Sequence, residues 1–166
     1  KEFNIDIVLC GNEEKIRHIM KENNISDEHI EIAHADSVID MEDDANAVVK
    51  TKTDSSMAVG YRLLKENRGD AFVSAGNSGA VLVGASLIIR RIKGIKRAAL
   101  APLLPNLNGC SMLIDCGANV ECKPEYLVQF AVMGSIYMNK MLKIENPRIA
   151  LANNGTEEHK GTSLQI

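Results

Sequence analysis

Residues 71–89 read AFVSAGNSGAVLVGASLII, and this stretch decides the fold prediction. A short apolar run at 71–73 leads into the glycine-rich turn SAGNSGA, and a longer apolar stretch follows. That order predicts a strand that passes through a tight turn into a helix. Gly76 allows a positive φ, and Gly79 allows a ligand or another helix to approach closely. The turn is therefore either an anion cradle at a helix N-terminus or a packing turn, and both readings stay open.

The composition limits the class of protein. Hydrophobic residues make up 45% and charged residues 25% of the 166 residues, which suits one domain or a large piece of one. The net charge of -3 comes from mixed signs, so neither nucleic acid nor an anionic lipid surface is an expected partner. The apolar runs are too short to span a bilayer, and no signal peptide is recognisable. The chain does not begin with Met and stops in a helix-like sequence, so we expect a fragment of a longer protein.

The four cysteines do not have the spacing of a zinc site. They are Cys10, Cys110, Cys116 and Cys122. Cys10 and Cys116 lie in apolar runs, where a free thiol behaves as a small hydrophobic group. We expect structural thiols, a reducing cytoplasm, no metal and no cofactor.

Apolar periodicity alternates along the chain between strand-like and helix-like segments. Strands are predicted at 3–11, 29–35, 71–73, 111–116 and 147–153. Helices are predicted at 13–23, 47–67 with a break near 54–56, 77–91, and from Pro124 to about Leu142. In the apolar stretch 97–106, Pro102 and Pro105 limit any strand to its first residues. Alternating strands and helices predict a layered α/β fold with a mainly parallel sheet.

Polar residues follow three of the predicted strands. The segments are SAGNSGA, DCGAN at 115–119 and ANNGTEEHKG at 152–161. Ligands of open α/β sheets bind beyond the carboxyl ends of the strands, so we expect these segments to converge on one edge. Asp115 is expected to hold a lysine, bond to loop amides or orient a substrate, and Lys160 to bind a phosphate or stabilise an oxyanion. His159 and Glu157 are weaker candidates for a general acid or base.

Several other polar residues receive structural interpretations. His34 is expected to be a buried structural histidine, and Lys50 and Lys52 to lie on a solvated helix face. The basic stretch 91–97 is expected to be a solvated helix end. The sequence has no P-loop, no dinucleotide fingerprint, no G-x-S-x-G elbow and no H-E-x-x-H motif. The remaining amides, hydroxyls and one lysine suit positioning of an anion better than covalent or redox chemistry.

In this order, SAGNSGA, RIKGIKRAALAPLLP, LIDCGANVECKPEYLVQFAVMGSIY and NNGTEEHKG resemble the bacterial phosphate acyltransferases of phospholipid synthesis (PlsX-type). The resemblance covers nearly the whole chain. It implies transfer of a fatty acyl group from acyl-carrier protein to inorganic phosphate. It also implies a three-layer α/β/α fold similar to that of isocitrate and isopropylmalate dehydrogenases. A homodimer in the cytoplasm, possible peripheral contact with the membrane, and no cofactor are further expectations from the family.

The resemblance assigns site residues by position. The family's SAGNTGA turn corresponds to Ser74, Gly76, Asn77, Ser78 and Gly79, and its D-V-G-A-N turn to Asp115, Gly117, Ala118 and Asn119. Its N-x-G-T-E-x-x-K-G loop corresponds to Asn153, Gly155, Thr156, Glu157, Lys160 and Gly161. The implied catalytic residues are Lys160, Asn153 and Asp115, and the others bind phosphate or substrate. The family's N-terminal D-A-M-G-G-D strand end and its second half are absent, so residues 1–166 are expected to be a partial α/β domain.

Other functions are left open by the sequence. The same chemistry with an acyl-CoA donor would make the protein a phosphate acetyl- or butyryltransferase. A half-length chain is alternatively a non-catalytic module that binds carrier protein or a second subunit. A nicotinamide dehydrogenase is the least favoured, because no strand end carries a dinucleotide fingerprint.

Overall fold

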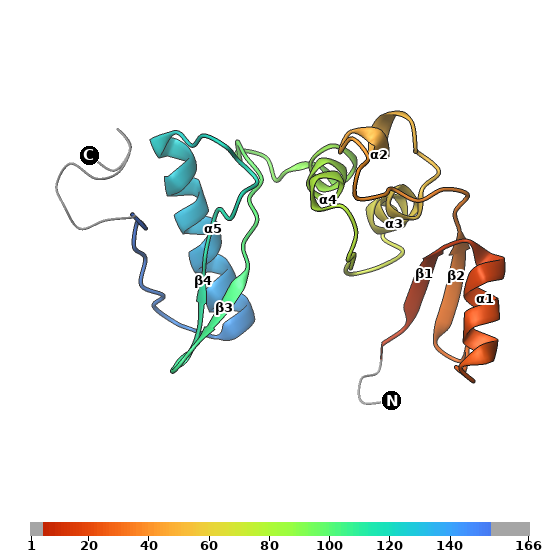
Figure 1. The fold of residues 1–166 in the computed structure, drawn as a ribbon. Coiled ribbons are helices and arrows are strands. Elements are labelled where there is room, and N and C mark those ends of the chain that lie inside the picture. Colours follow the sequence, from red (N-terminus) through yellow and green to blue (C-terminus); the bar gives the residue numbers. More distant parts are fainter. Residues whose placement is uncertain (1–4, 154–166) are drawn as a thin grey trace. The chain divides into compact units, whose positions relative to one another are not determined.

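The computed structural model describes residues 5–153. The chain divides into two compact units, of which the first ends at Ile92 and the second begins at Lys93 (Figure 1). Unit 1 comprises the described residues up to Ile92, and unit 2 comprises those from Lys93 on.

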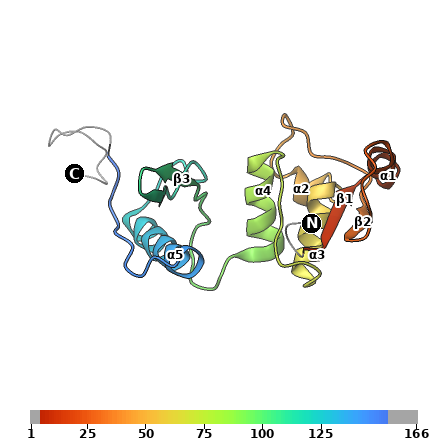
Figure 2. The same cartoon turned by 90° about the horizontal axis from the view of Figure 1, so that it is seen from below.

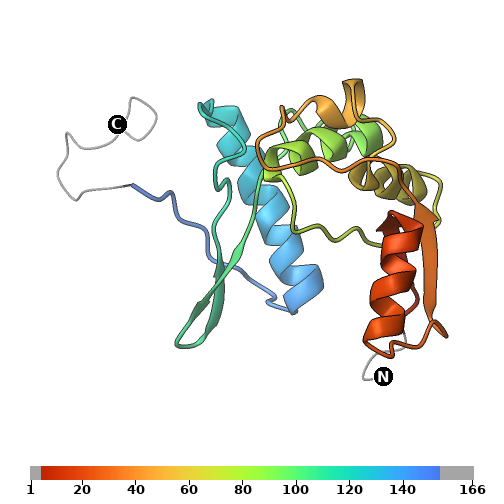
Figure 3. The ribbon, with the colours of Figure 1, turned by 45° about the vertical axis from the view of Figure 1, so that its right-hand side comes forward.

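Unit 1 opens with a parallel βαβ arrangement. Strand β1 (Ile7–Gly11) pairs with β2 (Ile30–His34), in a register that places Ile7 opposite Ile30 and Gly11 opposite His34. Helix α1 (Glu13–Glu22) connects the two strands and lies beside them (Figure 3). Asn12 caps this helix, since its side-chain oxygen accepts a hydrogen bond from the backbone N–H of Lys15 at 3.0 Å. The predicted parallel pair and its connecting helix are confirmed.

The rest of unit 1 is helical. The helix predicted at 47–67 is two helices, α2 (Ala47–Lys50) and α3 (Ser56–Lys65). The break between them is near the predicted position but is longer than predicted. Helix α4 (Ser78–Gly84) continues directly into a π-helical turn, η1 (Ala85–Arg90), as predicted for 77–91. Figure 2 shows α4 beside α2 and α3.

Aliphatic side chains and one tyrosine form the core of unit 1. The buried members are Ile39, Val48, Met57, Ala58, Tyr61 and Ala80. The Tyr61 ring lies 4.4 Å from the Phe72 ring between centroids, and its hydroxyl donates to the carbonyl of Val81 at 2.7 Å. Burial raises the pKa of Tyr61 to about 12. Gly84 leaves room for this ring, because a Cβ there would overlap with it.

Unit 2 consists of a hairpin and a long helix. Strands β3 (Leu103–Asn106) and β4 (Gly109–Met112) pair antiparallel, and helix α5 (Pro124–Leu142) lies beside them (Figure 3). Pro124 starts α5 as predicted, and Lys143 ends it in the left-handed conformation with φ of 59°.

Two strand predictions are wrong within the described residues, and a third is confirmed only in part. Residues 71–73 form no ladder, since Phe72 packs on Tyr61 while Val73 is 93% exposed. The strand predicted at 111–116 starts at Gly109 and ends at Met112, and residues 147–153 form no strand. Pro105 lies inside β3 and does not end it. Strand β3 has only one neighbour, β4, so every second N–H group of β3 faces away from the partner strand. A proline, which has no N–H, is tolerated at such a position.

The described part of the chain is thus a small α/β structure with a short parallel sheet and packed helices. The antiparallel hairpin departs from the mainly parallel pattern, and the three-layer dehydrogenase-like fold remains an expectation. No helix among residues 5–153 is long and apolar enough to cross a membrane. All four cysteines are free, and Cys116 is exposed and outside any strand, contrary to its expected place in an apolar strand.

Candidate functional site

The turn SAGNSGA starts helix α4 as predicted. Asn77 is the N-cap, and its Oδ1 accepts a hydrogen bond from the backbone N–H of Ala80 at 3.0 Å. The Ser74 hydroxyl accepts from the N–H of Gly76 at 3.1 Å, which tightens the turn. Gly76 does not have a positive φ, so that part of the prediction is wrong. Gly79 is a close-approach position, because a Cβ there would lie 3.1 Å from the Ala45 Cβ.

Asn77 also connects the turn to the acidic loop at 40–43, which precedes α2. Its Nδ2 donates to three backbone carbonyls, at 3.2 Å to Asp40, 3.3 Å to Met41 and 3.1 Å to Asp43. The side chain is 7% exposed. We call this set of bonds, with the cap to Ala80, the Asn77 clasp. Because the amide group is occupied on both sides, Asn77 shapes the turn, and Ser78 remains the exposed polar side chain beside it.

Lys52 also binds the acidic loop, through hydrogen bonds and charge. The Lys52 Nζ donates to Asp43 Oδ2 at 2.6 Å and to the carbonyl of Val38 at 2.9 Å, and lies 3.6 Å from Asp40 Oδ2. The hydrogen bond from Lys52 lowers the pKa of Asp43, and the same bond raises the pKa of Lys52. With its side chain 29% exposed, Lys52 is not the solvated residue that the sequence suggested, whereas Lys50 is exposed as predicted.

The turn DCGAN in unit 2 is organised by its aspartate. Asp115 Oδ1 accepts from the N–H groups of Leu100 at 2.8 Å and Ala118 at 3.2 Å. Oδ2 accepts from the backbone N–H of Asn119 at 2.8 Å and from its Nδ2 at 2.9 Å. Gly117 has a φ of +96°, which favours glycine there. Asp115 therefore bonds to loop amides, which was one of its three predicted roles.

These bonds set the charge state of Asp115. Burial raises its pKa, but the hydrogen bonds from the Asn119 side chain and from the backbone amides of Leu100, Ala118 and Asn119 outweigh burial. The net pKa is below the usual 3.8, so the carboxylate is ionised at neutral pH. Asn119 extends the network, because its Nδ2 also donates to the carbonyl of Ala98 at 2.8 Å.

Asp115→Asn is expected to lower the free energy of unfolding of unit 2 by about 1–3 kcal/mol at pH 7, because one acceptor becomes a donor that faces N–H groups. A pKa lowered by folding stabilises the native state above the unfolded-chain pKa, and this contribution is lost as pH falls through the folded pKa. The difference between variant and wild type should therefore shrink below about pH 4. Urea unfolding at pH 7 and pH 3 measures it. A difference that is the same at both pH values would contradict the assignment.

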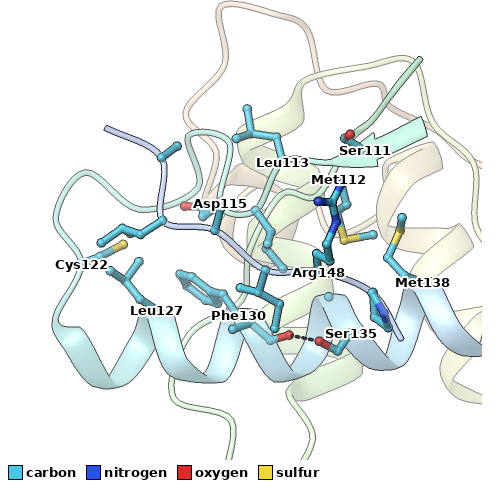
Figure 4. A pocket seen from close by; sticks show the side chains of 18 of the residues that line it. Ser111, Met112, Leu113, Asp115, Cys122, Leu127, Phe130, Ser135, Met138 and Arg148 are labelled. Carbon is cyan, nitrogen blue, oxygen red and sulfur yellow. Dashed lines mark hydrogen bonds between the residues drawn. The ribbon is translucent and has the colours of Figure 1, made fainter. Parts of the chain in front are cut away.

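A cavity of about 1390 Å³ opens in unit 2 between the hairpin, α5 and the segment 144–152. Asp115 and Asn119 lie in its wall. Figure 4 shows Asp115 with Met112, Phe130 and Met138, which also line the cavity. The cavity thus combines one of the predicted polar turns with an apolar helix face.

The predicted site residues fall into three groups. Ser74, Gly76, Asn77, Ser78 and Gly79 belong to unit 1, and Asp115, Gly117, Ala118 and Asn119 to unit 2. Asn153 is the last described residue, and Gly155, Thr156, Glu157, His159, Lys160 and Gly161 lie outside the described residues. Convergence of the three polar segments on one edge therefore stays a prediction.

Two further findings concern titratable residues. His34 is exposed rather than buried, and it joins β2 to α1 by accepting from the N–H of Glu13 at 3.2 Å through Nδ1. Its Nε2 lies 3.1 Å from Asp36 Oδ1. Within residues 5–153 no group of three or more His, Cys, Asp or Glu side chains is placed to hold a metal ion. The polar groups of the SAGNSGA turn are amides, hydroxyls and a carboxamide, which suit positioning of an anion, whereas the second turn also contains the Asp115 carboxylate.

The described residues thus form a small α/β structure with two ordered polar turns and one cavity with an apolar wall. The model of the family described as "Fatty acid synthesis protein" matches residues 1–166, and the chain belongs to this family. A protein of Alkaliphilus oremlandii is 48% identical over 164 residues, which is 99% of this chain and 49% of that protein. One of Dictyoglomus turgidum is 48% identical over 165 residues (99% and 49%), and one of Acetivibrio thermocellus 49% over 156 residues (94% and 46%).

All three of these relatives are named phosphate acyltransferase. The chain spans about half the length of the curated relatives it matches.

Proposed function

We propose that the protein containing this chain transfers a fatty acyl group from acyl-carrier protein to inorganic phosphate and so makes acyl phosphate for phospholipid synthesis. The observation that carries the proposal is 48% identity, over 99% of the chain, to proteins named phosphate acyltransferase. The turn before α4 supports it, because the backbone N–H groups at the start of that helix and the exposed Ser78 hydroxyl lie beside Asn77.

The proposed reaction is a direct displacement. A phosphate oxygen attacks the thioester carbonyl carbon, the new C–O bond forms, and the C–S bond breaks. The carrier thiolate leaves with the electron pair and then takes a proton from solvent. Because the phosphate dianion is already a nucleophile, the main task of the protein is to hold it against the carbonyl.

The residues have separate tasks in this proposal. Ser74, Ser78 and the amides that follow Asn77 bind phosphate. Gly117 and Asn119 belong to the second proposed binding turn, in which the N–H groups of Asn119 already donate to Asp115. Asp115 and Asn77 keep the two turns in shape through the bonds described above. Lys160 neutralises the phosphate or stabilises the developing oxyanion, with Asn153, Thr156, Glu157 and Gly161 in the same loop. A homodimer and peripheral membrane contact are further parts of the proposal.

The test uses the full-length protein with hexadecanoyl-[acyl-carrier protein] and inorganic phosphate. Acyl phosphate is trapped by hydroxylamine as the hydroxamate, and hexadecanoyl-CoA serves as the matched donor. We expect hydroxamate that depends on phosphate, with a higher kcat/KM for the carrier-protein donor. A higher kcat/KM for the CoA donor would favour the acetyl- or butyryltransferase alternative. Binding of carrier protein without product from either donor would favour the non-catalytic module.

A further inference from the structure

Helix α5 has apolar residues on two opposite faces. One face is buried within unit 2 through Phe130 and Met138. The other face carries Val128, Val132 and Ile136, which are 65%, 54% and 57% exposed. We call these three residues the outer stripe of α5. Single apolar side chains are common on protein surfaces, but a helix that is apolar all round is normally buried all round. The outer stripe is therefore a surface that another element is expected to cover.

The outer stripe is continuous and firmly supported. Its members follow one another at intervals of four residues, which places them on one side of the helix over about 12 Å. Gln129, next to Val128, fixes the helix to the segment before β3. Its Oε1 accepts from the N–H of Lys96 at 2.9 Å, and its Nε2 donates to the carbonyl of Gly94 at 2.9 Å. The stripe is thus presented on a rigid element of unit 2.

Opposite charges lie at the two ends of the outer stripe. Glu125 precedes Val128 by three residues and Lys140 follows Ile136 by four, so both lie on the side of the helix that carries the stripe. Both residues are exposed. The hydrogen bond from Lys96 to Glu125, at 2.7 Å, lowers the pKa of the Glu125 carboxyl, so this group is charged at neutral pH.

This order of residues is complementary to itself when it is reversed. Val128 and Ile136 lie four residues on either side of Val132, and Glu125 and Lys140 lie seven residues before it and eight after it. In two antiparallel copies of α5 related by a two-fold axis near Val132, each Glu125 faces Lys140 of the other copy. The apolar residues then meet between these charged pairs. Such matching of one patch with itself is what a two-fold interface requires.

We propose that the outer stripe of α5, with Glu125 and Lys140 at its ends, docks on the same surface of a second copy of the full-length protein. The other possible cover is the part of the full-length protein outside these 166 residues, since the relatives are about twice as long. A cover from the same chain does not require a pattern that is symmetric about Val132, and this symmetry favours the second copy. The inference rests on the homodimer of the proposed function but not on the acyl transfer reaction.

The first test uses two charge-reversal variants of the full-length protein, Glu125→Lys and Lys140→Glu. In the dimer of either variant alone, two pairs of like charges meet. In a mixed dimer both pairs have opposite charges, one between the two replaced residues and one between the two native ones. We expect mixed dimers to exceed about 75% of all dimers after coexpression, against about 50% for random pairing, because two favourable pairs replace two repulsive ones. Native mass spectrometry measures this fraction.

The comparison contains its own control. Glu125→Lys also loses the bond to Lys96, but it does so equally in its own dimer and in the mixed dimer. A mixed fraction of about 50% would overturn the proposal, because it would mean that the two charges do not meet across the interface. This result is also the one expected if the rest of the same chain covers the outer stripe.

The second test changes the centre of the outer stripe. Val132→Glu places two carboxylates together at the two-fold axis and should raise the dimer Kd at least tenfold, as measured by sedimentation equilibrium. Leu107→Glu is the matched control. Leu107 is an apolar residue in the turn between β3 and β4 that is 103% exposed, so its variant should keep the wild-type Kd. An unchanged Kd in a folded Val132→Glu protein would overturn the proposal, and the charge-reversal test decides if this variant does not fold.

The proposed function and this inference fail in different ways. A wild-type protein that is monomeric at every concentration overturns the docking surface together with the homodimer, while the hydroxamate assay still decides about acyl transfer. A dimer that forms no acyl phosphate but shows the preference for mixed pairs refutes the activity and supports the docking surface.

Discussion

Asn77→Ala is expected to lower the free energy of unfolding of unit 1 by about 2–4 kcal/mol. The variant loses the N-cap of α4, which contributes about 1 kcal/mol, and leaves three carbonyls of the acidic loop without their donor. Asp40 and Met41 are exposed, so water replaces part of the loss. Hydrogen exchange of the amides in 40–43 and 78–84 measures the effect locally.

Asn12→Ala is the matched control for this prediction. Asn12 makes the same type of cap, to the N–H of Lys15 at 3.0 Å, and its replacement should cost about 1 kcal/mol. Asn77→Asp separates the two roles of the clasp, because a carboxylate keeps the cap but turns an oxygen toward the three carbonyls. It should be at least as destabilising as Asn77→Ala. If Asn77→Ala cost no more than Asn12→Ala, the bonds to the acidic loop would have no energetic role.

Lys160→Ala is expected to lower kcat for acyl phosphate formation by about 10²–10³-fold in the full-length protein. The ammonium group is proposed to face the charge that develops in the transition state, and removal of one such donor has an effect of this size. Lys160→Arg should restore part of the rate, because it keeps the charge but not the compact shape of the ammonium. Single-turnover and steady-state rates at saturating phosphate measure the effect on kcat.

Lys65→Ala is the control for charge alone. Lys65 is an exposed lysine in the last turn of α3, so its variant should retain the wild-type rate. A Lys160→Ala protein with near-wild-type kcat would remove Lys160 from the catalytic assignment. A raised KM for phosphate with unchanged kcat would restrict Lys160 to ground-state binding.

Local signals in the sequence predicted the local structure well. The helices predicted at 13–23 and 77–91, and the helix start predicted at Pro124, agree with α1, with α4 and its π-helical continuation, and with α5. Strands were harder, since a strand exists only where another strand lies beside it. The apolar residues 71–73 and 147–153 have the composition of strands, but in the described residues they have no neighbour to pair with.

The roles of the candidate site residues could be predicted only in part. Asp115 bonds to loop amides, as one of its predicted roles states, and Asn77 holds a distant loop, a role that was not predicted. Their assignment to catalysis and binding stays a prediction. The partners of Asn77 are backbone carbonyls 34–37 residues away. Every residue has a backbone carbonyl, so the residue types do not show which of them accepts a hydrogen bond. For the same reason no role was predicted for the acidic loop at 40–43. Its charge pattern, with Lys52 nine residues after Asp43, was the one available signal.

The Asn77 clasp has a consequence for the kinetics of folding. It joins positions 34–37 residues apart, so the chain that includes α2 and α3 must close into a loop before these bonds form. Such contacts are expected after the transition state, where their loss speeds unfolding and barely slows folding. The clasp would then determine how long the native turn persists once formed, rather than how fast it is reached.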